Sequence, residues 1–339
     1  MYNWLLVFLI FSIVTIIFFY AYEKSKINIA ITFLITISIF YLMIFPKSSM
    51  DSISSGANLF VNSIFPTLFP FLILTNILMN YNGINILGKL FGNIISKPLR
   101  ISKNSIFPLI ISFICGYPLG TKYLNDVHKK NLITDSEFQR MINIASNTSP
   151  LFLIGSVGAS MLGNKIYGYI LLIANYFSCI LMCFIIPNKD KFKNSLNDDT
   201  TLTKKNFGDV LKSSLENAIK TCAIVGGFII FFSLIKEILT NNIYTKILFN
   251  KFPILKSIFI GVFEITNGIN LIISSNISIS IMLSIISFLC SFSGACIILQ
   301  CYSFVHDNKA FNLKKYIFFK MIQGIISFLI TLISCLIFI

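Results

Sequence analysis

Glu264 is an acidic residue well inside an apolar stretch of the chain. A carboxylate near the centre of a bilayer costs about 3 kcal/mol on insertion scales, so it is expected to face a cavity, a partner or a proton. Two interpretations stay open. Glu264 binds a substrate or a coupling ion together with Thr266 and Asn267, or it only caps the backbone N–H groups of those two residues at a wet turn. We favour the first interpretation.

Two groups of small polar side chains interrupt apolar segments in a similar way. Their hydroxyl and amide groups either contact a ligand or satisfy the backbone carbonyls that a broken helix frees, as Ser and Thr often do in membrane helices. The first group is dense and is followed by proline, and the second group mirrors it later in the chain, so we favour a ligand site. The groups are Ser146, Asn147, Thr148 and Ser149, and Ser291, Ser293 and Gln300.

A third break lies in the apolar run that begins near Ile106. Gly116, Pro118 and Gly120 would interrupt a helix there and leave backbone groups without partners. Hydrocarbon tolerates such backbone only where it is buried in protein or lines a wet cavity. The pattern therefore predicts a re-entrant hairpin that faces a pathway. Tyr117 at its tip either stacks on a ring of the substrate or anchors packing.

These breaks recur at one spacing. An offset of 145 residues carries Gly116 onto Gly261, which opens a second glycine-bracketed break, and carries residues 145–149 onto 290–294. Two broken elements in the same order suggest an internal repeat. Paired interrupted segments in two halves are the best sequence pointer to the binding site of a transporter.

Signatures of enzymes are scarce in this sequence. His128 and His306 are its two histidines and sit in loops, and the chain has neither a P-loop nor the histidine and serine motifs of common hydrolases. The eight cysteines lie in or beside apolar segments without any C-x-x-C pair, so we expect them to pack as small residues rather than to form disulfides or a zinc site. We predict that the protein is not an enzyme and needs no cofactor or metal.

The composition places these features in a membrane. The chain is 55% hydrophobic and 12% charged, with a mean hydropathy of +0.82, which leaves too little polar surface for a soluble globule of 339 residues. The formal charge of +14 comes from Lys and Arg between the apolar runs, which is typical of cytoplasmic membrane flanks and argues against a nucleic-acid partner. We predict an all-α polytopic membrane protein whose surroundings are the lipid bilayer.

The apolar runs divide the chain into four parts. These are residues 1–50 with two transmembrane helices at 4–22 and 27–45, a first repeat at 51–187, a lysine-rich cytoplasmic linker at 188–212, and a second repeat at 213–339. The first repeat is expected to begin with a bent helix at 57–79, an interfacial amphipathic helix at 82–100 and the first hairpin. A helix that starts with a capping box at 134–137 and breaks before Pro150 follows, and the repeat ends with a helix at 166–187.

The second repeat is expected to follow the same plan from the opposite side of the membrane. It has a helix at 215–239 interrupted at Gly226 and Gly227, a second hairpin at 257–273, a broken helix at 279–302 and a last helix at 316–339. Halves built alike but oppositely oriented make an inverted repeat. One feature argues against this orientation, because it places Lys236, Lys246, Lys251 and Lys256 outside.

Four blocks of this sequence resemble a known family. They are residues 59–71, the Gly-Tyr-Pro-Leu-Gly-Thr-Lys run at 116–122, residues 132–140, and the Ala-Ser-Asn-Thr-Ser-Pro-Leu-Phe run at 145–152. They look like the YlbJ family of sporulation integral membrane proteins, which is part of a larger group with nucleoside-recognition, or Gate, domains. The likeness covers nearly the whole chain and is weaker in its second half. Gate domains are similar to parts of concentrative nucleoside transporters, where two opposed re-entrant hairpins and two broken helices surround the substrate.

The resemblance implies a role in spore formation. It implies an alternating-access transporter that moves dipicolinic acid from the mother cell across the outer forespore membrane, so that the protein lies in that membrane or in the cell membrane of a spore-forming bacterium. Beyond Glu264 and Gln300 there is no clear match to the acidic and glutamine residues that nucleosides meet in the related transporters. A small dianion would suit helix N-termini and a site with few carboxylates.

Two alternatives remain beside an anion carrier. One is a nucleoside-type carrier, and the other is a membrane scaffold for spore assembly that transports nothing. A scaffold needs an extended docking surface, whereas the longest soluble segment here is the linker at 188–212. The sequence leaves open whether the chain forms a homo-oligomer.

Overall fold

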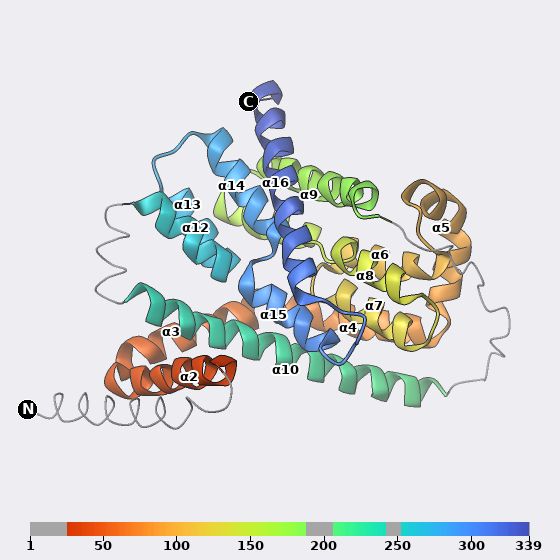
Figure 1. Cartoon of the computed structure of the whole chain (residues 1–339), viewed down its shortest axis with the longest axis horizontal. Helices are drawn as coiled ribbons and strands as arrows, with labels where there is room; N and C mark the ends of the chain where they lie inside the picture. The colour runs from red at the N-terminus through yellow and green to blue at the C-terminus, as the bar shows by residue number, and fades with distance from the viewer. Residues whose placement is uncertain (1–25, 188–205, 242–251, 339) are drawn as a thin grey trace, which may run out of the picture.

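The computed structural model describes residues 26–187, 206–241 and 252–338, and every regular element in these ranges is a helix (Figure 1). The predicted helix at 4–22 and most of the predicted linker at 188–212 lie outside the described residues. Within the described part, five helices are long and apolar enough to cross a membrane: Pro46–Asn80, Lys165–Ile185, Phe207–Thr240, Ile279–Val305 and Leu313–Ile337. The prediction of an all-α polytopic membrane protein is confirmed.

The described chain starts with α2 (Lys26–Ile44), which is followed by a long helical stretch made of α3 (Pro46–Leu59), η1 (Phe60–Ile64) and α4 (Phe65–Asn80). Proline suits the first turn of α3, since the N–H it lacks has no intrahelical partner there. The irregularity predicted from the prolines of this stretch takes the form of η1, a π-helical turn just before Pro66. Such widened turns are frequent at functional sites.

The predicted amphipathic helix at 82–100 is α5 (Gly83–Leu99). Its small residues Gly88, Gly92 and Ser96 are buried against the protein. Leu90 and Ile94 are 65% and 72% exposed, so the helix presents large apolar side chains outward. This arrangement suits a helix in contact with lipid.

The first hairpin is formed by α6 (Ile106–Cys115) and α7 (Leu119–Lys129), which follow the short η2 (Lys103–Ser105). The chain reverses at Gly116, whose φ of +80° is readily adopted by glycine. The capping box then begins α8 (Asp135–Ile144), where Thr134 Oγ1 accepts from the Glu137 backbone N–H at 3.3 Å. The Glu137 carboxylate accepts from the Ser102 N–H at 2.8 Å, near the start of the first hairpin.

Arg140 on α8 holds three helices together. It is 2% exposed. It donates to the carbonyl of Leu99 at 3.0 Å and of Ile186 at 3.2 Å, and also to those of Arg100 and Cys183. A guanidinium at these carbonyls satisfies the C-terminal ends of α5 and α9 (Lys165–Ile185).

The predicted break before Pro150 is present. Residues 145–149 are not helical, and the chain resumes as η3 (Leu151–Met161), a π-helical segment that packs against α9.

The second half contains α10 (Phe207–Thr240), the second hairpin of α12 (Pro253–Phe263) and α13 (Ile265–Ile273), the broken helix of α14 (Ile279–Phe292) and α15 (Gly294–Val305), and α16 (Leu313–Phe338). The interruption predicted at Gly226 and Gly227 is wrong, because α10 is continuous there. Gly226 instead leaves room for the ring of Phe60, which a Cβ at this position would strike. The end of the predicted linker is also helical, since α10 begins at Phe207.

The two halves repeat the order of hairpin, broken helix and long helix. Cys115 and Phe263, which end α6 and α12, are 148 residues apart, and so are Ile144 and Phe292, which end α8 and α14. These two pairs of helix ends are therefore spaced slightly more widely than the offset of 145 residues that aligns the breaks in the sequence.

The halves also interlock. α7 packs on α15, where Asn125 Nδ2 donates to the Phe304 carbonyl at 2.7 Å. Beside this contact Lys129 Nζ donates to Asp307 at 2.7 Å, and this hydrogen bond lowers the pKa of the Asp307 carboxyl below its usual value. The end of the first hairpin and the loop after the second broken helix therefore lie on the same side of the molecule.

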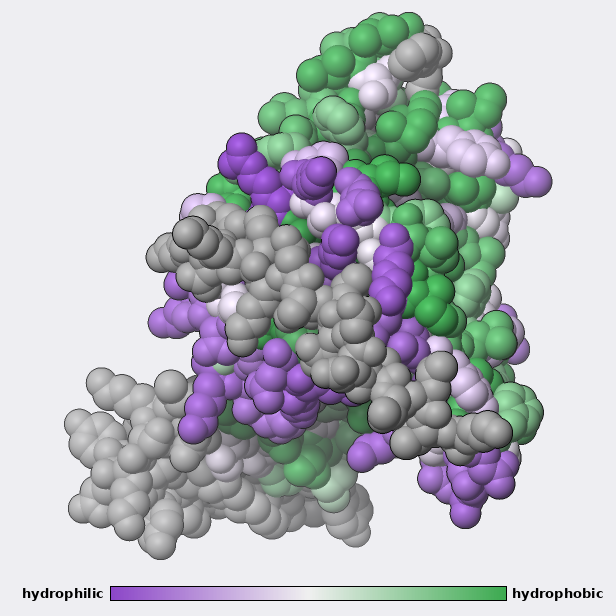
Figure 2. All heavy atoms as spheres, turned by 90° about the vertical axis from the view of Figure 1, so that its right-hand side faces the viewer, coloured by the Kyte–Doolittle hydropathy of each residue, from purple (hydrophilic) through white to green (hydrophobic). Residues whose placement is uncertain are grey.

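The surface is divided by polarity. Viewed from the end of the molecule at which α5, α7 and α8 lie, hydrophilic side chains gather over the middle and lower parts, and hydrophobic side chains cover the upper part (Figure 2). Lys129 and Lys130 are exposed at the α7–α8 loop. A polar end next to an apolar surface is expected of a protein that crosses a bilayer.

Candidate functional site

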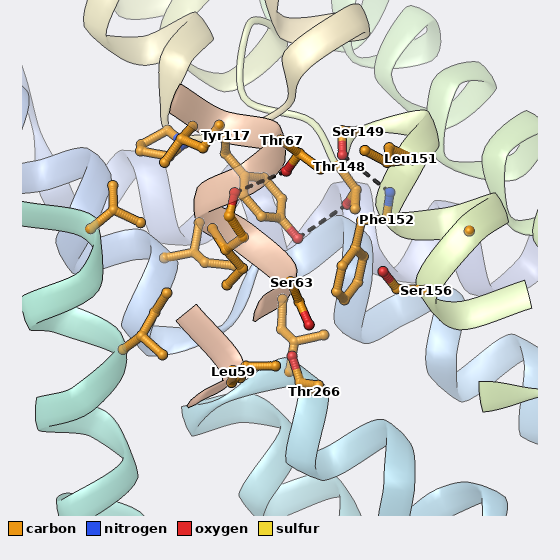
Figure 3. A pocket seen from close by; sticks show the side chains of 18 of the residues that line it. Leu59, Ser63, Thr67, Tyr117, Thr148, Ser149, Leu151, Phe152, Ser156 and Thr266 are labelled. Carbon is orange, nitrogen blue, oxygen red and sulfur yellow. Dashed lines mark hydrogen bonds between the residues drawn. The ribbon is translucent and has the colours of Figure 1, made fainter. Parts of the chain in front are cut away.

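A cavity of about 490 Å³ lies where the breaks of the two halves meet. Its walls come from α4 and the π-helical η1, the tip of the first hairpin, the first helix break with η3, α10, the tip of the second hairpin, and α15 (Figure 3). Ligand sites are commonly of this size and are largely apolar with a few converging polar groups. Both π-helical segments of the described chain contribute to the lining.

The tip of the first hairpin contributes Tyr117 and Pro118 to the lining. The Tyr117 N–H donates to the Asn147 carbonyl at 2.7 Å, so the hairpin tip rests on the first helix break. Gly116 and Gly120 lie outside the lining and make this approach possible. A Cβ on Gly116 would press on the Ser149 backbone, and a Cβ on Gly120 would meet the Ala145 carbonyl.

Thr148 and Ser149 bring the first polar group to the cavity. Thr148 Oγ1 is hydrogen-bonded to Tyr117 Oη at 3.2 Å (Figure 3). It is also hydrogen-bonded to the Cys290 carbonyl at 2.9 Å, which links the two halves. Ser149 Oγ accepts from the Phe152 N–H at 3.3 Å and so satisfies a donor in the first turn of η3.

Ser146 and Asn147 are buried behind the lining. Asn147 Nδ2 donates to the Ile144 carbonyl at 2.7 Å, and Asn147 Oδ1 accepts from Gln323 Nε2 at 3.1 Å. Ser146 Oγ is hydrogen-bonded to Tyr316 Oη at 2.7 Å. The first polar group therefore divides in two, with one pair facing the cavity and the other holding the helix break to α16.

Glu264 caps α13 and also lines the cavity. Its Oε1 accepts from the Thr266 N–H at 3.1 Å and its Oε2 from the Asn267 N–H at 2.8 Å, so the carboxylate caps α13. It is 8% exposed and still lines the cavity, as Thr266 does. Asn267 lies outside the lining and accepts from Lys236 Nζ at 3.2 Å. Among the described residues that line the cavity, Glu264 alone is of an acidic or basic type.

The second polar group contributes one residue to the lining, Gln300, whose Nε2 donates to Cys296 Sγ at 3.3 Å. Ser291 is buried behind it and accepts from Asn175 Nδ2 at 2.8 Å. Ser293 is the hinge between α14 and α15, with a φ of +82°, and is fully buried.

The cavity thus brings together seven of the fourteen residues proposed from the sequence. They are Tyr117, Pro118, Thr148, Ser149, Glu264, Thr266 and Gln300. The other seven stand next to the lining or support it: Gly116, Gly120, Ser146, Asn147, Asn267, Ser291 and Ser293.

Sequence reasoning missed further polar residues at this site. Ser63, Thr67 and Ser156 line the cavity from η1, α4 and η3, and only their polarity among apolar neighbours could have marked them. Lys320 and Gln323 of α16 reach the first helix break from far along the chain. A lysine inside the last apolar run was a signal for this contact, because charged residues in membrane segments usually face the protein interior.

Four helical elements begin at the cavity. The residues at the start of α7 (Pro118), η3 (Leu151), α13 (Ile265) and α15 (Cys296) all line it. The first N–H groups of a helix lack intrahelical acceptors, and its N-terminus carries a partial positive charge. At α13 the Glu264 carboxylate already accepts from the Thr266 and Asn267 N–H groups, whereas the starts of α7, η3 and α15 have no carboxylate cap.

Comparisons with known proteins agree with a membrane role. No family model matches the chain, and no solved structure matches it. Over 310 residues the chain is 23% identical to the sporulation integral membrane protein YlbJ of Bacillus subtilis (strain 168), an alignment that covers 83% of this chain and 76% of that protein. The resemblance inferred from the sequence blocks is confirmed at the level of YlbJ, and this chain is a multi-pass integral membrane protein similar to that sporulation protein.

Proposed function

We propose that this protein is a carrier, not an enzyme, and that it moves a small organic anion across a membrane by alternating access during spore formation. The observation that carries the proposal is the meeting of four helix starts, two from each half, around one cavity. Interrupted segments that converge in this way form the substrate sites of secondary transporters.

The electrostatics of the cavity favour an anion. The N-termini of α7, η3 and α15, which have no carboxylate cap, supply partial positive charge to the cavity. The only carboxylate of the described lining, Glu264, already accepts from two backbone N–H groups of α13. Its charge is therefore compensated locally, which reduces its repulsion of an anionic cargo.

Dipicolinic acid is the cargo that we propose. It is a flat pyridine ring whose two carboxylates flank the ring nitrogen, so it needs an apolar slot with hydrogen-bond donors along one edge. Phe71, Tyr117 and Phe152 supply aromatic surface in the lining. Hydroxyl groups of Ser63, Ser149 and Ser156 stand around the same space (Figure 3). The similarity to a sporulation protein supports the biological setting.

The outer forespore membrane is the proposed site of action, and an inverted repeat of Gate-like halves is the proposed framework. The equal 148-residue offsets of the two hairpin ends and the two helix breaks support the repeat. Alternating access would then consist of a movement of the hairpins and breaks around the cavity.

Flux of labelled dipicolinate into proteoliposomes containing the purified protein tests the function. We expect uptake that a large side chain in the cavity abolishes. Ser156→Phe places a ring in the lining, whereas Ile173→Phe places the same ring on α9 at a position that is 65% exposed and serves as the matched control. Uptake of labelled uridine in place of dipicolinate would identify a nucleoside-type carrier. No uptake of either compound by folded protein would favour the scaffold.

A further inference from the structure

Lys320 is a fully buried lysine at the first helix break. Its Nζ donates to the Ser146 carbonyl and, at 2.9 Å, to Gln323 Oε1. The described residues provide no carboxylate in ion-pair contact with it. Its partners are therefore neutral oxygens at the carbonyl end of α8, where the helix dipole is negative.

The hydrogen-bond network fixes the orientation of both amides next to this lysine. Asn147 Nδ2 donates to the Ile144 carbonyl, so Asn147 Oδ1 must be the atom that faces Gln323. Gln323 Nε2 donates to that oxygen at 3.1 Å, which leaves Gln323 Oε1 directed at Lys320. The groups around Nζ are thus hydrogen-bond acceptors, and they suit a positive charge.

The two oxygens that contact Nζ, a backbone carbonyl and a side-chain amide oxygen, are of the type that also binds alkali cations. In secondary transporters the carbonyls of unwound segments and the C-terminal ends of half-helices coordinate the coupling cation. We propose that the Lys320 ammonium is a tethered cation that takes the place of a coupling metal ion at the first break. This inference rests on the proposed carrier function and adds that transport needs no Na⁺ at this position.

The second helix break provides an internal comparison. Leu172 and Asn175 precede Lys320 and Gln323 by 148 residues, the spacing of the matching helix ends. The amide is kept at the second break, where Asn175 donates to Ser291, but leucine replaces the lysine. Two buried oxygens there, Asn175 Oδ1 and Ser293 Oγ, have no hydrogen-bond partner among the described residues. Of the two helix breaks, the first therefore has a buried lysine beside it, and the second has a leucine at the matching position.

The test is the thermal stability of the purified full chain in detergent, measured in NaCl and in choline chloride at equal ionic strength. For the wild type we expect the same Tm in both salts. Lys320→Ala opens the space at the oxygens, so we expect its Tm to be lower in choline and to rise saturably with Na⁺. Leu172→Ala is the matched control, and its Tm should fall by the same amount in both salts.

Three results would overturn the inference. They are a folded Lys320→Ala protein with equal Tm in the two salts, a wild type whose Tm rises with Na⁺ as much as that of Lys320→Ala, and a Lys320→Met protein as stable as the wild type. Lys320→Met also decides the case if Lys320→Ala cannot be purified, since methionine fills the volume without a charge and should lower the Tm in both salts. Because Tm is read without transport, failure of the carrier function in the flux assay is a separate outcome.

Discussion

The hydroxyl of Tyr117 lies 3.2 Å from Thr148 Oγ1, and this contact joins the tip of the first hairpin to the first helix break. Thr148 Oγ1 continues the chain to the Cys290 carbonyl of the second half at 2.9 Å. The hydrogen bonds of one threonine therefore join the first hairpin tip, the first helix break and α14. A typical hydrogen bond of this kind contributes about 0.5–1.5 kcal/mol net to stability.

Thr148→Val tests this link. Valine keeps the shape of threonine but removes Oγ1, so the Tyr117 hydroxyl and the Cys290 carbonyl lose their shared partner. We expect the free energy of unfolding to fall by about 0.5–1.5 kcal/mol, as for a typical net hydrogen bond, or somewhat more because the site is buried. Denaturation of the purified protein followed by circular dichroism measures it. An unchanged midpoint would show that the contact does not contribute.

Asn147→Ala and Ser149→Ala should differ although the two residues are neighbours. Asn147 is 1% exposed and bonds to Ile144 and Gln323, so its loss leaves buried groups unsatisfied, at about 1–3 kcal/mol each. Ser149 lines the cavity and accepts from the Phe152 N–H at 3.3 Å, so Ser149→Ala should reduce dipicolinate uptake and lower the Tm less than Asn147→Ala does. Uptake and Tm are measured on the same preparations. Equal loss of Tm in both variants would argue that the two residues have the same role.

Sequence patterns located the helix breaks well because glycine, proline and polar clusters act locally on the backbone. The hairpin turn at Gly116 and the break before Pro150 are both present. The same logic failed at Gly226, where the glycine serves contact with Phe60 and not a change of backbone direction. A sequence does not show whether a glycine is required for close packing of a neighbouring side chain or for a positive φ.

The direction of each polar side chain was harder to predict. Asn147 and Thr148 are adjacent in the sequence, yet one faces α16 and the other faces the cavity. This choice depends on Lys320 and Gln323, which come from α16, far along the chain. Long-range partners of this kind leave no local pattern, so half of the proposed residues proved to be support for the cavity wall.

The proposed opposite orientation of the halves predicts which loops face which side. Lys130 and Ser278 are both exposed and are 148 residues apart, the first after α7 and the second after α13. In a cysteine-free background, a membrane-impermeant maleimide should label Ser278→Cys on intact cells and Lys130→Cys only after the membrane is opened. Labelling of both from outside would place the two hairpins on one side, and the inverted repeat would fall.

Glu264→Gln decides whether the charge of this residue matters. Glutamine keeps one acceptor for the first turn of α13 but replaces the second carboxylate oxygen with a donor that faces the Asn267 N–H. If Glu264 binds a proton or cation that couples to transport, net uphill flux of dipicolinate should fail while exchange of internal for external dipicolinate persists, because the loaded carrier can still reorient. If it is only a cap, the loss should appear in the stability of the protein, within the range of about 0.5–2 kcal/mol known for N-caps, and net flux should keep its dependence on pH.

Net flux and exchange measured over a range of pH, with Thr266→Ser as a control that preserves the backbone N–H, distinguish the two roles. Unchanged net flux with an unchanged pH profile would rule out coupling and leave Glu264 as the cap of the second hairpin.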